Sequence, residues 1–359
     1  MKQSDMAIVA IHQDPSAPTP YATRWGESLT EAGVQVRWVN LRMPNAIGQV
    51  AQCQGVMWHW EFMPHERQVG YRILHTIEQY LKIPVFPNHR TAWHYDDKLA
   101  QYYIFQALGV PTPQTWVFWD HEPARAWAKT ATYPKVFKLA TGASSFAVSI
   151  VETLDQALAL IDLMFGTGTY PDALHQTATS TGLIPRNRRQ WEAAILRWKR
   201  VLRWAIKDQL PDLPPRFWWQ PEKNYVYFQE FIPNNEFDTR ITVIGDRAFG
   251  FRRFNRPGDF RASGSGRIDH DPGRIDDDSI ELAFNISKLL GAQSMAYDIL
   301  RDENGRPVIG EMSYTYLDWA VERCPGHWTP TLDWIEGHVW PESAQVTDFL
   351  SAIQGSARG

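Results

Sequence analysis

Apolar and polar runs alternate along the first ninety residues in an order that predicts strands and helices in turn. Residues 7–11 form a short apolar run that ends in a polar, proline-rich segment, which is typical of a buried strand followed by a loop. Residues 21–32 have helical spacing and end before Gly33, and residues 34–41 alternate as a strand does. Further strands are expected at 54–60 and 83–86, with a helix at 66–81 between them. This alternation predicts a small parallel sheet with crossover helices.

A second α/β part begins with a helix at residues 97–108, which should end at Gly109 because two prolines stand just beyond it. The pattern then predicts a helix at 154–163 and strands at 115–119, 136–139, 148–151, 225–231, 238–244, 248–254, 296–300 and 308–312. The pair Asn304-Gly305 lies between the last two strands and predicts a tight hairpin. The chain is therefore expected to be α/β (α+β) rather than all-helical or all-strand.

Residues 166–223 break this rhythm and are interpreted as an insertion. Their centre, near residues 189–209, has the spacing of an amphipathic helix, with tryptophans on one face and basic residues on another. Residues 186–207 contain eight Lys and Arg but only one acid, Glu192. We favour a helix that packs its tryptophan face on its own domain. Binding of an acceptor substrate, or peripheral contact with a membrane surface, is the alternative for such a basic helix.

Charge and cysteine content narrow the class of protein. Over 359 residues, 36 Lys and Arg balance 40 Asp and Glu, so the net charge of −4 argues against a general nucleic-acid binder. The length predicts two or three domains. Only Cys53 and Cys324 are present, and the N-terminal residues lack the apolar core of a signal peptide, which predicts a cytoplasmic location. The sequence leaves the oligomeric state open, a homodimer included.

Two carboxylates lie on the arms of the predicted hairpin. Asp298 and Glu311 should be brought together when the hairpin folds around Asn304-Gly305. Two converging carboxylates form a hard oxygen site that suits magnesium, with water and substrate phosphates as the remaining ligands. On the hairpin alone, solvated acids at the strand ends remain the alternative.

Candidate phosphate-binding groups lie upstream of the hairpin. Lys138 stands in an apolar strand and runs into a turn of small residues that includes Ser144 and Ser145, whose backbone N–H groups could approach phosphates. Lys98, at the start of its helix, could offer a second charge, although a solvated lysine is the alternative there. Further along, residues 247–274 contain seven arginines and three aspartates, which suits capture of phosphate or carboxylate.

In this order and spacing the residues resemble the ATP-grasp superfamily. The strongest likeness lies in FQEFIPNNEFDTR, FRRFNRPGDFRASGSGRI, AYDIL and GEMS, which are similar to the ribosomal-protein glutamate ligases and, more distantly, to glutathione synthetases and D-alanine ligases. The likeness covers roughly residues 87–315 without the insertion. It implies an ATP-grasp fold in three parts, with ATP held between two sheets: an N-terminal Rossmann-like domain at 1–92, a central lid region at 93–230 and a C-terminal ATP-grasp domain at 231–359.

The resemblance also implies roles for single residues. Those that correspond to nucleotide-binding positions, for phosphate, adenine and ribose, are Lys98, Lys138, Ser144, Ser145, Gln229, Glu230, Phe231, Ile232 and Glu236. Those that correspond to magnesium ligands are Asp298, Glu311 and Ser313. Those that resemble groups steadying the triphosphate and an acyl-phosphate are Arg240, Arg253 and Arg261. Ser313 stands where the family usually has asparagine, and the turn at 142–146 lacks the usual second glycine.

The chemistry implied is that of an ATP- and magnesium-dependent, ADP-forming ligase. Such an enzyme joins a carboxylate to an amine, on small molecules or peptides, through an acyl-phosphate. Two alternatives stay open: an ATP-binding regulatory module without turnover, and a kinase that phosphorylates a small-molecule acceptor. All three would bind ATP, so their products would separate them.

Overall fold

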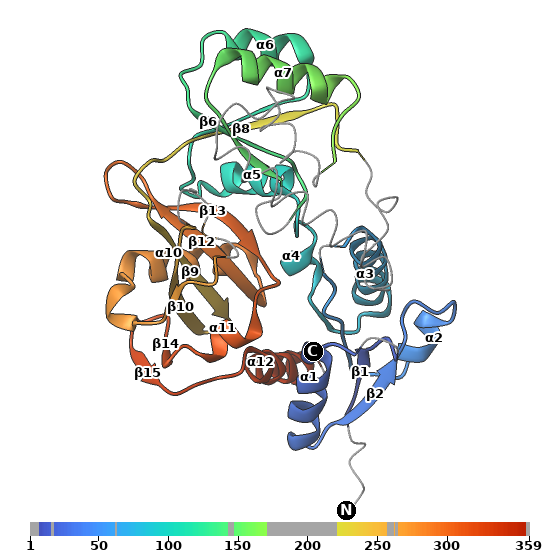
Figure 1. Ribbon diagram of the computed structural model, residues 1–359. Coiled ribbons are helices and arrows are strands. Elements are labelled where there is room, and N and C mark those ends of the chain that lie inside the picture. Colours follow the sequence, from blue (N-terminus) through green and yellow to red (C-terminus); the bar gives the residue numbers. More distant parts are fainter. Residues whose placement is uncertain are drawn as a thin grey trace, which may run out of the picture. The chain divides into compact units, whose positions relative to one another are not determined.

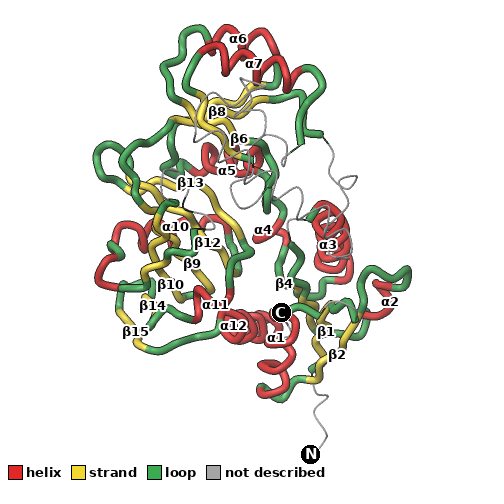
Figure 2. Tube along the Cα trace, viewed as in Figure 1, coloured by secondary structure: helices red, strands yellow, loops and turns green. Residues whose placement is uncertain are grey.

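The computed structural model describes residues 7–15, 18–61, 63–142, 147–170, 221–256, 262 and 265–356. The chain divides into two compact units (Figures 1 and 2). The larger unit joins Met1–Gln114 to Ile232–Gly359, and the smaller unit is Thr115–Phe231. Each unit has its own sheets and is described by itself.

The first sheet of the larger unit has four parallel strands in the order β2-β1-β3-β4, so the predicted parallel sheet is confirmed. Its strands are β1 (Ile8–His12), β2 (Gln35–Val39), β3 (Gly55–Met57) and β4 (Val85–Phe86). The helices of this region are α1 (Pro20–Glu31), α2 (Ala46–Val50), α3 (Pro64–Thr76) with a π-helical end (Ile77–Leu81), α4 (His89–Ala92) and α5 (Lys98–Leu108). The C-terminal helix α12 (Pro341–Ser356) packs beside α1, and Phe349 joins Ile11 and Trp25 in one buried cluster (Figure 1). The two ends of the chain therefore share a core.

The second sheet of the larger unit is antiparallel and follows the order β13-β12-β9-β10-β14-β15. Its strands are β9 (Phe237–Ile244), β10 (Arg247–Phe254), β11 (Ile268–Asp269, paired with β10), β12 (Ser294–Arg301), β13 (Pro307–Ser313), β14 (Gly326–Trp328) and β15 (Trp334–Glu336). Helix α10 (Asp277–Leu290) covers one face, where Ile280 and Ala283 cluster with Ile241 and Tyr297. Phe251 lies on the opposite face, in a cluster with residues of α11 (Asp318–Glu322).

The predicted hairpin is confirmed, and three longer helices were not predicted. β12 pairs with β13 around a turn in which the N–H of Gly305 donates to the carbonyl of Asp302 at 3.0 Å. Helix α10 begins after Asp276, whose carboxylate accepts from the N–H of Ser279 at 2.8 Å, and it ends at Gly291, whose φ is 64°. Helices α12 and α6 (His121–Ala128) were likewise absent from the sequence-based expectations.

The smaller unit is a four-stranded sheet in the order β5-β8-β6-β7, packed against two helices. Its elements are β5 (Thr115–Phe118), α6, β6 (Lys135–Lys138), β7 (Val148–Val151), α7 (Leu154–Phe165) and β8 (Val226–Glu230). The predicted insertion helix near 189–209 lies outside the described residues. Within the described ranges, the chain contains no helix long and apolar enough to cross a membrane.

Candidate functional site

The strand register of the antiparallel sheet brings five charged side chains together. Asp298 on β12 lies opposite Glu311 on β13 and opposite Arg240 on β9, while Arg253 on β10 lies opposite Asp238 on β9. Directly opposed residues share a face of a sheet, and Asp238 and Arg240 are two apart on one strand. All five side chains therefore lie on one face of the sheet.

This charged face is the one turned away from helix α10. Ile241, which follows Arg240 and so faces the other way, is buried in the cluster that includes Ile280 of α10. Phe251, two residues before Arg253 and on the same face as it, belongs to the opposite cluster. One end of this face is thus apolar and supports the sheet, while the other end carries the charges.

Two guanidinium groups neutralise the two aspartates in bidentate pairs. Arg240 donates to Asp298 from Nε at 2.6 Å and from Nη2 at 2.9 Å. Arg253 donates to Asp238 from Nε at 2.7 Å and from Nη2 at 2.6 Å, and the same Nη2 lies 2.6 Å from Oδ2 of Asp298. Paired forks of this kind are among the strongest hydrogen bonds in proteins. The four residues form a charge-balanced network that links three strands.

The electrostatics of this network follow from burial and from the pairing. Burial raises the pKa of Asp238, against the opposing charge of Arg253. Burial alone would do the same to Asp298, but Arg240 and Arg253 outweigh it and hold the pKa of Asp298 well below its usual range. Burial disfavours the charged form of Arg253, yet Asp298 and Asp238 keep its pKa above the usual value. Asp298 is therefore a carboxylate, as a metal ligand must be.

Glu311 is paired with a lysine from helix α5. Nζ of Lys98 lies 3.3 Å from Oε1 of Glu311, and the lysine side chain is 5% exposed against 40% for the glutamate. Gln101, one turn further on, donates to the carbonyl of Met312 at 2.9 Å and accepts from its N–H at 3.3 Å. Because residues three apart share a helix face, the contact of Gln101 with β13 also directs Lys98 toward Glu311. Gln101 was missed in the sequence, although this spacing from Lys98 could have indicated it.

The third predicted metal residue, Ser313, lies beside the two carboxylates but is hydrogen-bonded locally. It stands two residues after Glu311 on the same strand, and its hydroxyl donates to the carbonyl of Thr315 at 2.8 Å. Among the described residues, no group of three His, Cys, Asp or Glu side chains could hold a metal ion. Asp298 and Glu311 as a pair nevertheless suit magnesium, which needs only one or two carboxylates when water and phosphates complete its shell. The metal site stays a prediction.

On the smaller unit, the two lysines of β6 have different surroundings. Lys138 is half-buried, and its Nζ lies 6.0 Å from the centre of the Tyr227 ring. Lys135 is buried, and its Nζ donates to both carboxylate oxygens of Glu230, at 3.0 and 2.8 Å. Three residues apart on a strand, the two lysines point to opposite faces of the sheet. The Glu230 side chain is thus paired with Lys135, so the predicted nucleotide contact of Glu230 would be made by its backbone.

The segment predicted to hold adenine and ribose runs out of the sheet at the end of β8. Gln229 and Glu230 are paired within the sheet, and the buried Gln229 side chain donates to Oγ1 of Thr115 at 2.9 Å. Phe231 and Ile232 follow the strand end. Glu236 is exposed just before β9. The roles of these residues stay predictions, and Ser144, Ser145 and Arg261 lie outside the described residues.

The turn after β6 contains a contact that the sequence did not suggest. The carboxylate of Glu222 accepts from the backbone N–H of Ala140 at 2.9 Å and from that of Thr141 at 3.1 Å. Thr141 is the first residue of the stretch predicted to approach phosphates, and Ala140 directly precedes it. Glu222 was grouped with the insertion, and no local pattern connects it to a turn 82 residues away.

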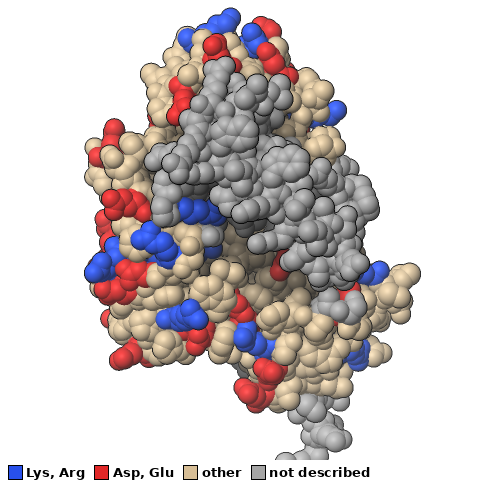
Figure 3. Space-filling model, in the orientation of Figure 1, with Lys and Arg blue, Asp and Glu red and all other residues tan. Residues whose placement is uncertain are grey.

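The arginine-rich stretch at 247–274 is largely committed to the protein's own acids. Besides Arg253, Arg247 pairs with Asp348 at 3.0 Å, Arg252 with Asp269 at 2.5 Å and Arg274 with Asp271 at 3.1 Å. The described acids and bases are interspersed on the face seen in Figure 3 rather than gathered by sign. Four of the seven arginines in this stretch are therefore paired with acids of the protein itself.

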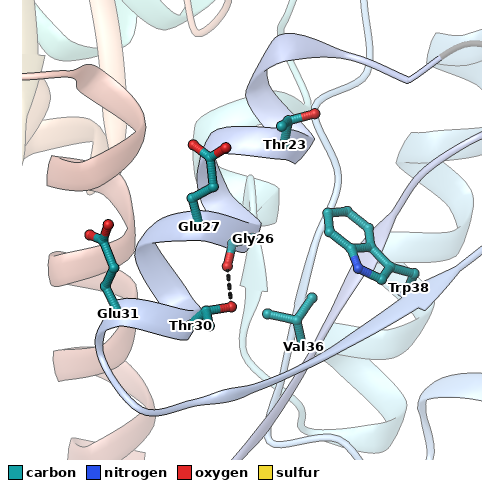
Figure 4. Close-up of a pocket in the computed structure, with 7 residues that line it drawn as sticks. All are labelled: Thr23, Gly26, Glu27, Thr30, Glu31, Val36 and Trp38. Atoms are coloured by element: carbon teal, nitrogen blue, oxygen red, sulfur yellow. Dashed lines mark hydrogen bonds between the residues drawn. The ribbon is translucent and has the colours of Figure 1, made fainter.

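An open groove of about 430 Å³ lies between α1 and β2 and contains none of the predicted site residues (Figure 4). It is lined by Thr23, Gly26, Glu27, Thr30, Glu31, Val36 and Trp38. The hydroxyl of Thr30 is occupied by a hydrogen bond to the carbonyl of Gly26 at 2.7 Å. Since only one side of α1 and an edge strand form this open groove, the charged sheet face is the stronger candidate for chemistry.

Comparison with known proteins agrees with this choice. Residues 220–315 match a RimK-like ATP-grasp domain, and this range contains all five charged residues of the sheet face. A curated relative, the alpha-aminoadipate–LysW ligase LysX of Saccharolobus solfataricus, is 22% identical over 232 residues, which is 64% of this chain and 65% of that protein.

Solved structures match over nearly the whole chain. The RimK domain ATP-grasp protein from Sphaerobacter thermophilus has a TM-score of 0.56 at 17% identity, over 96% of this chain and 100% of that one. The ATP-grasp ligase PsnB, in complex with a precursor peptide and AMPPNP, has a TM-score of 0.54 at 14% identity, over 98% and 99%. At these identities the likeness establishes the fold. The chain therefore has the fold of these ATP-grasp proteins, and its residues 220–315 match a RimK-like ATP-grasp domain.

Proposed function

We propose that the protein is an ATP-dependent ligase that joins a carboxylate to an amine through an acyl-phosphate. The observation that carries the proposal is the pairing of Asp298 and Glu311 across β12 and β13, with Arg240, Arg253 and Lys98 against them. Acids that suit magnesium and bases that suit phosphate alternate within one sheet face. This is the combination that phosphoryl transfer to a carboxylate requires.

In the proposed reaction the substrate carboxylate attacks the γ-phosphorus of ATP. A carboxyl oxygen–phosphorus bond forms, the bond from that phosphorus to the bridging oxygen of the β-phosphate breaks, and ADP leaves. The amine nitrogen then attacks the acyl carbon, inorganic phosphate leaves with the former carboxyl oxygen, and the nitrogen loses a proton. The protein contributes positioning and neutralisation of charge rather than a covalent nucleophile.

The ion-pair network is suited to an exchange of partners. Asp298 and Glu311 would hold magnesium, which supplies charge neutralisation at the phosphates when bound. Arg240 and Lys98, now paired with these carboxylates, would then be available for phosphate oxygens. Arg253 would remain on Asp238, its bidentate partner, and keep β9 and β10 in register.

The substrates are proposed by class only. The relative LysX is named as a ligase of alpha-aminoadipate and LysW, and the PsnB structure holds a precursor peptide. We propose a small-molecule or peptide carboxylate and a small-molecule or peptide amine for this chain.

Product analysis with isotopic labelling tests the proposal. The protein is incubated with ATP, magnesium and pools of acids, amines and peptides, with ¹⁸O in the carboxylates. A ligase releases ADP and phosphate only when both substrates are present, and an acyl-phosphate places one ¹⁸O in the phosphate. Phosphorylated acceptor without a new amide would instead identify a kinase, and ATP binding without turnover a regulatory module.

A further inference from the structure

A carboxylate from beyond the insertion holds the start of the turn after β6. One oxygen of Glu222, Oε2, accepts from the N–H of Ala140 at 2.9 Å and from the hydroxyl of Tyr225. The other, Oε1, accepts from the N–H of Thr141 at 3.1 Å and from the Thr141 hydroxyl. Each oxygen thus has two protein donors, and the N–H of Ala140 also donates to the hydroxyl oxygen of Tyr225 at 2.7 Å.

The backbone of Glu222 is fixed as firmly as its side chain. Its N–H donates to the carbonyl of Thr169 at 2.8 Å, and its carbonyl accepts from the N–H of Thr169 at 3.0 Å. Beside this bridge, Gly168 has a φ of 74°, and a Cβ there would lie 2.5 Å from the Glu222 carbonyl oxygen. The N–H of Asn224 donates to the carbonyl of Met164 at 2.8 Å, which ties the same segment to the end of α7. Glu222 therefore connects the end of α7 to the turn.

The turn held in this way directly follows the half-buried Lys138. The N–H of Leu139 donates to the carbonyl of Ala147 at 2.9 Å and closes the base of the turn. Successive backbone N–H groups that point at one anion form an anion-binding concavity. Here the carboxylate of Glu222 is the anion that accepts from two such amides, so the backbone of Ala140 and Thr141 is positioned beside Lys138 before any ligand binds.

We propose that Glu222 is a positioning residue for the phosphates of ATP. By holding the backbone of Ala140 and Thr141, it keeps the neighbouring Lys138 in the position that receives phosphate oxygens. The inference rests on the proposed function, because it presumes that this turn meets ATP. It predicts that loss of the carboxylate weakens nucleotide binding more, the more phosphate groups the nucleotide carries.

Nucleotide titration of the full chain tests the proposal with Glu222→Ala and Glu222→Gln, using ATP, ADP and adenosine as probes. We expect the affinity for ATP to fall about tenfold in Glu222→Ala, while the affinity for adenosine stays within about twofold. Glu222→Gln should lose less, since its carbonyl can still accept from Thr141 but its NH₂ group cannot accept from Ala140. The matched control is Glu152→Gln, an exposed glutamate at the end of β7, which should bind all three probes as the wild type does.

Four results would overturn the inference. If both variants bound ATP as tightly as the wild type, Glu222 would have no part in positioning the phosphates. Tighter ATP binding would show that the carboxylate competes with phosphate. An equal loss for adenosine and ATP would indicate a general structural defect. A wild-type chain that binds no ATP would overturn the proposed function as well, which separates the two failures. If Glu222→Ala does not fold, Tyr225→Phe removes the hydroxyl that donates to this carboxylate and accepts from the N–H of Ala140, and it should weaken the binding of ATP alone by about two- to threefold.

Discussion

Carboxylates in this protein are neutralised in two different ways. On the antiparallel sheet, Asp238 and Asp298 are held by the side chains of Arg240 and Arg253. On the smaller unit, Glu222 is held mainly by the backbone and by hydroxyl groups. A guanidinium group can turn to another partner by changing rotamer, whereas a backbone amide moves only with its turn. The sheet network is therefore suited to exchange of partners, and the turn contact to a fixed frame.

The largest expected effect on stability comes from replacing Arg253, which pairs with both Asp238 and Asp298. Arg253→Met leaves Asp238 and Asp298 short of a partner in a buried site, and we expect a loss of about 3–5 kcal/mol in the free energy of unfolding. Arg252→Met is the matched control on the same strand, because Arg252 faces the other way and pairs with Asp269, whose side chain is 26% exposed. That loss should be only about 1 kcal/mol. Urea titration of both variants measures the difference, and equal losses would contradict the network.

The second prediction concerns Glu311, whose substitution should lower turnover with little change in the free energy of unfolding. Glu311→Gln removes a charge next to Lys98 and from the proposed magnesium pair, and we expect ATP-dependent turnover to fall by about 100- to 1000-fold. Glu311 is 40% exposed, so the free energy of unfolding should change by about 1 kcal/mol or less. Glu303→Gln, at an exposed position in the turn of the same hairpin, is the control. Unchanged turnover in Glu311→Gln would remove the metal assignment.

The two regions differ in how far their contacts could be predicted from sequence. Asp298 and Glu311 are close along the chain and flank Asn304-Gly305, so turn chemistry alone placed them opposite each other. The partner of Glu222, by contrast, lies 82 residues away across an insertion, and nothing in strand or helix periodicity indicates such a contact. The bidentate partners of the aspartates were also not predicted, because they depend on the relative register of three strands.

In the fold too, features set by neighbouring residues could be predicted from sequence, whereas contacts between distant segments could not. Strands with regular alternation were predicted within a few residues of their observed bounds. Helix α10 was missed, although Asp276 and Gly291 carry ordinary capping signals at its two ends, so the sequence did contain the evidence. The packing of α12 on α1 could not be predicted, because no pattern in residues 341–356 indicates which distant helix they contact.

A third prediction compares the two lysines of β6 on the smaller unit. Lys138→Met should raise the KM for ATP about tenfold, because its proposed partner is a phosphate. Lys135→Met should leave that KM unchanged and lower the free energy of unfolding by about 1 kcal/mol, since Glu230 is 40% exposed and can be solvated. Steady-state kinetics and thermal unfolding of both variants measure the two effects. If only Lys135→Met raised the KM for ATP, phosphate binding would have to be assigned to Lys135 instead of Lys138.

The smallest predicted effect concerns Glu342, a buried carboxylate with a single, longer contact to an arginine. Glu342, at the start of α12, is fully buried, and its Oε2 finds no hydrogen-bond partner among the described residues, while Arg24 lies 3.3 Å from Oε1. Burial raises the pKa of Glu342 to about 7, well above its ordinary value. The folded state therefore keeps a proton that the unfolded chain has already lost. Stability should be greatest below the unfolded pKa and should fall as the pH rises toward the folded value.

Glu342→Gln tests this sign, because glutamine resembles the protonated acid at every pH. The variant and the wild type should be equally stable near pH 4, and the variant should gain on the order of 1 kcal/mol by pH 8. Unfolding midpoints across this range measure the gain, with Glu336→Gln as an exposed control that should show no trend. A difference that does not depend on pH would mean that Arg24 already neutralises Glu342. The buried acid would then belong with the arginine-held aspartates, because a guanidinium at one oxygen would have been enough to keep it ionised.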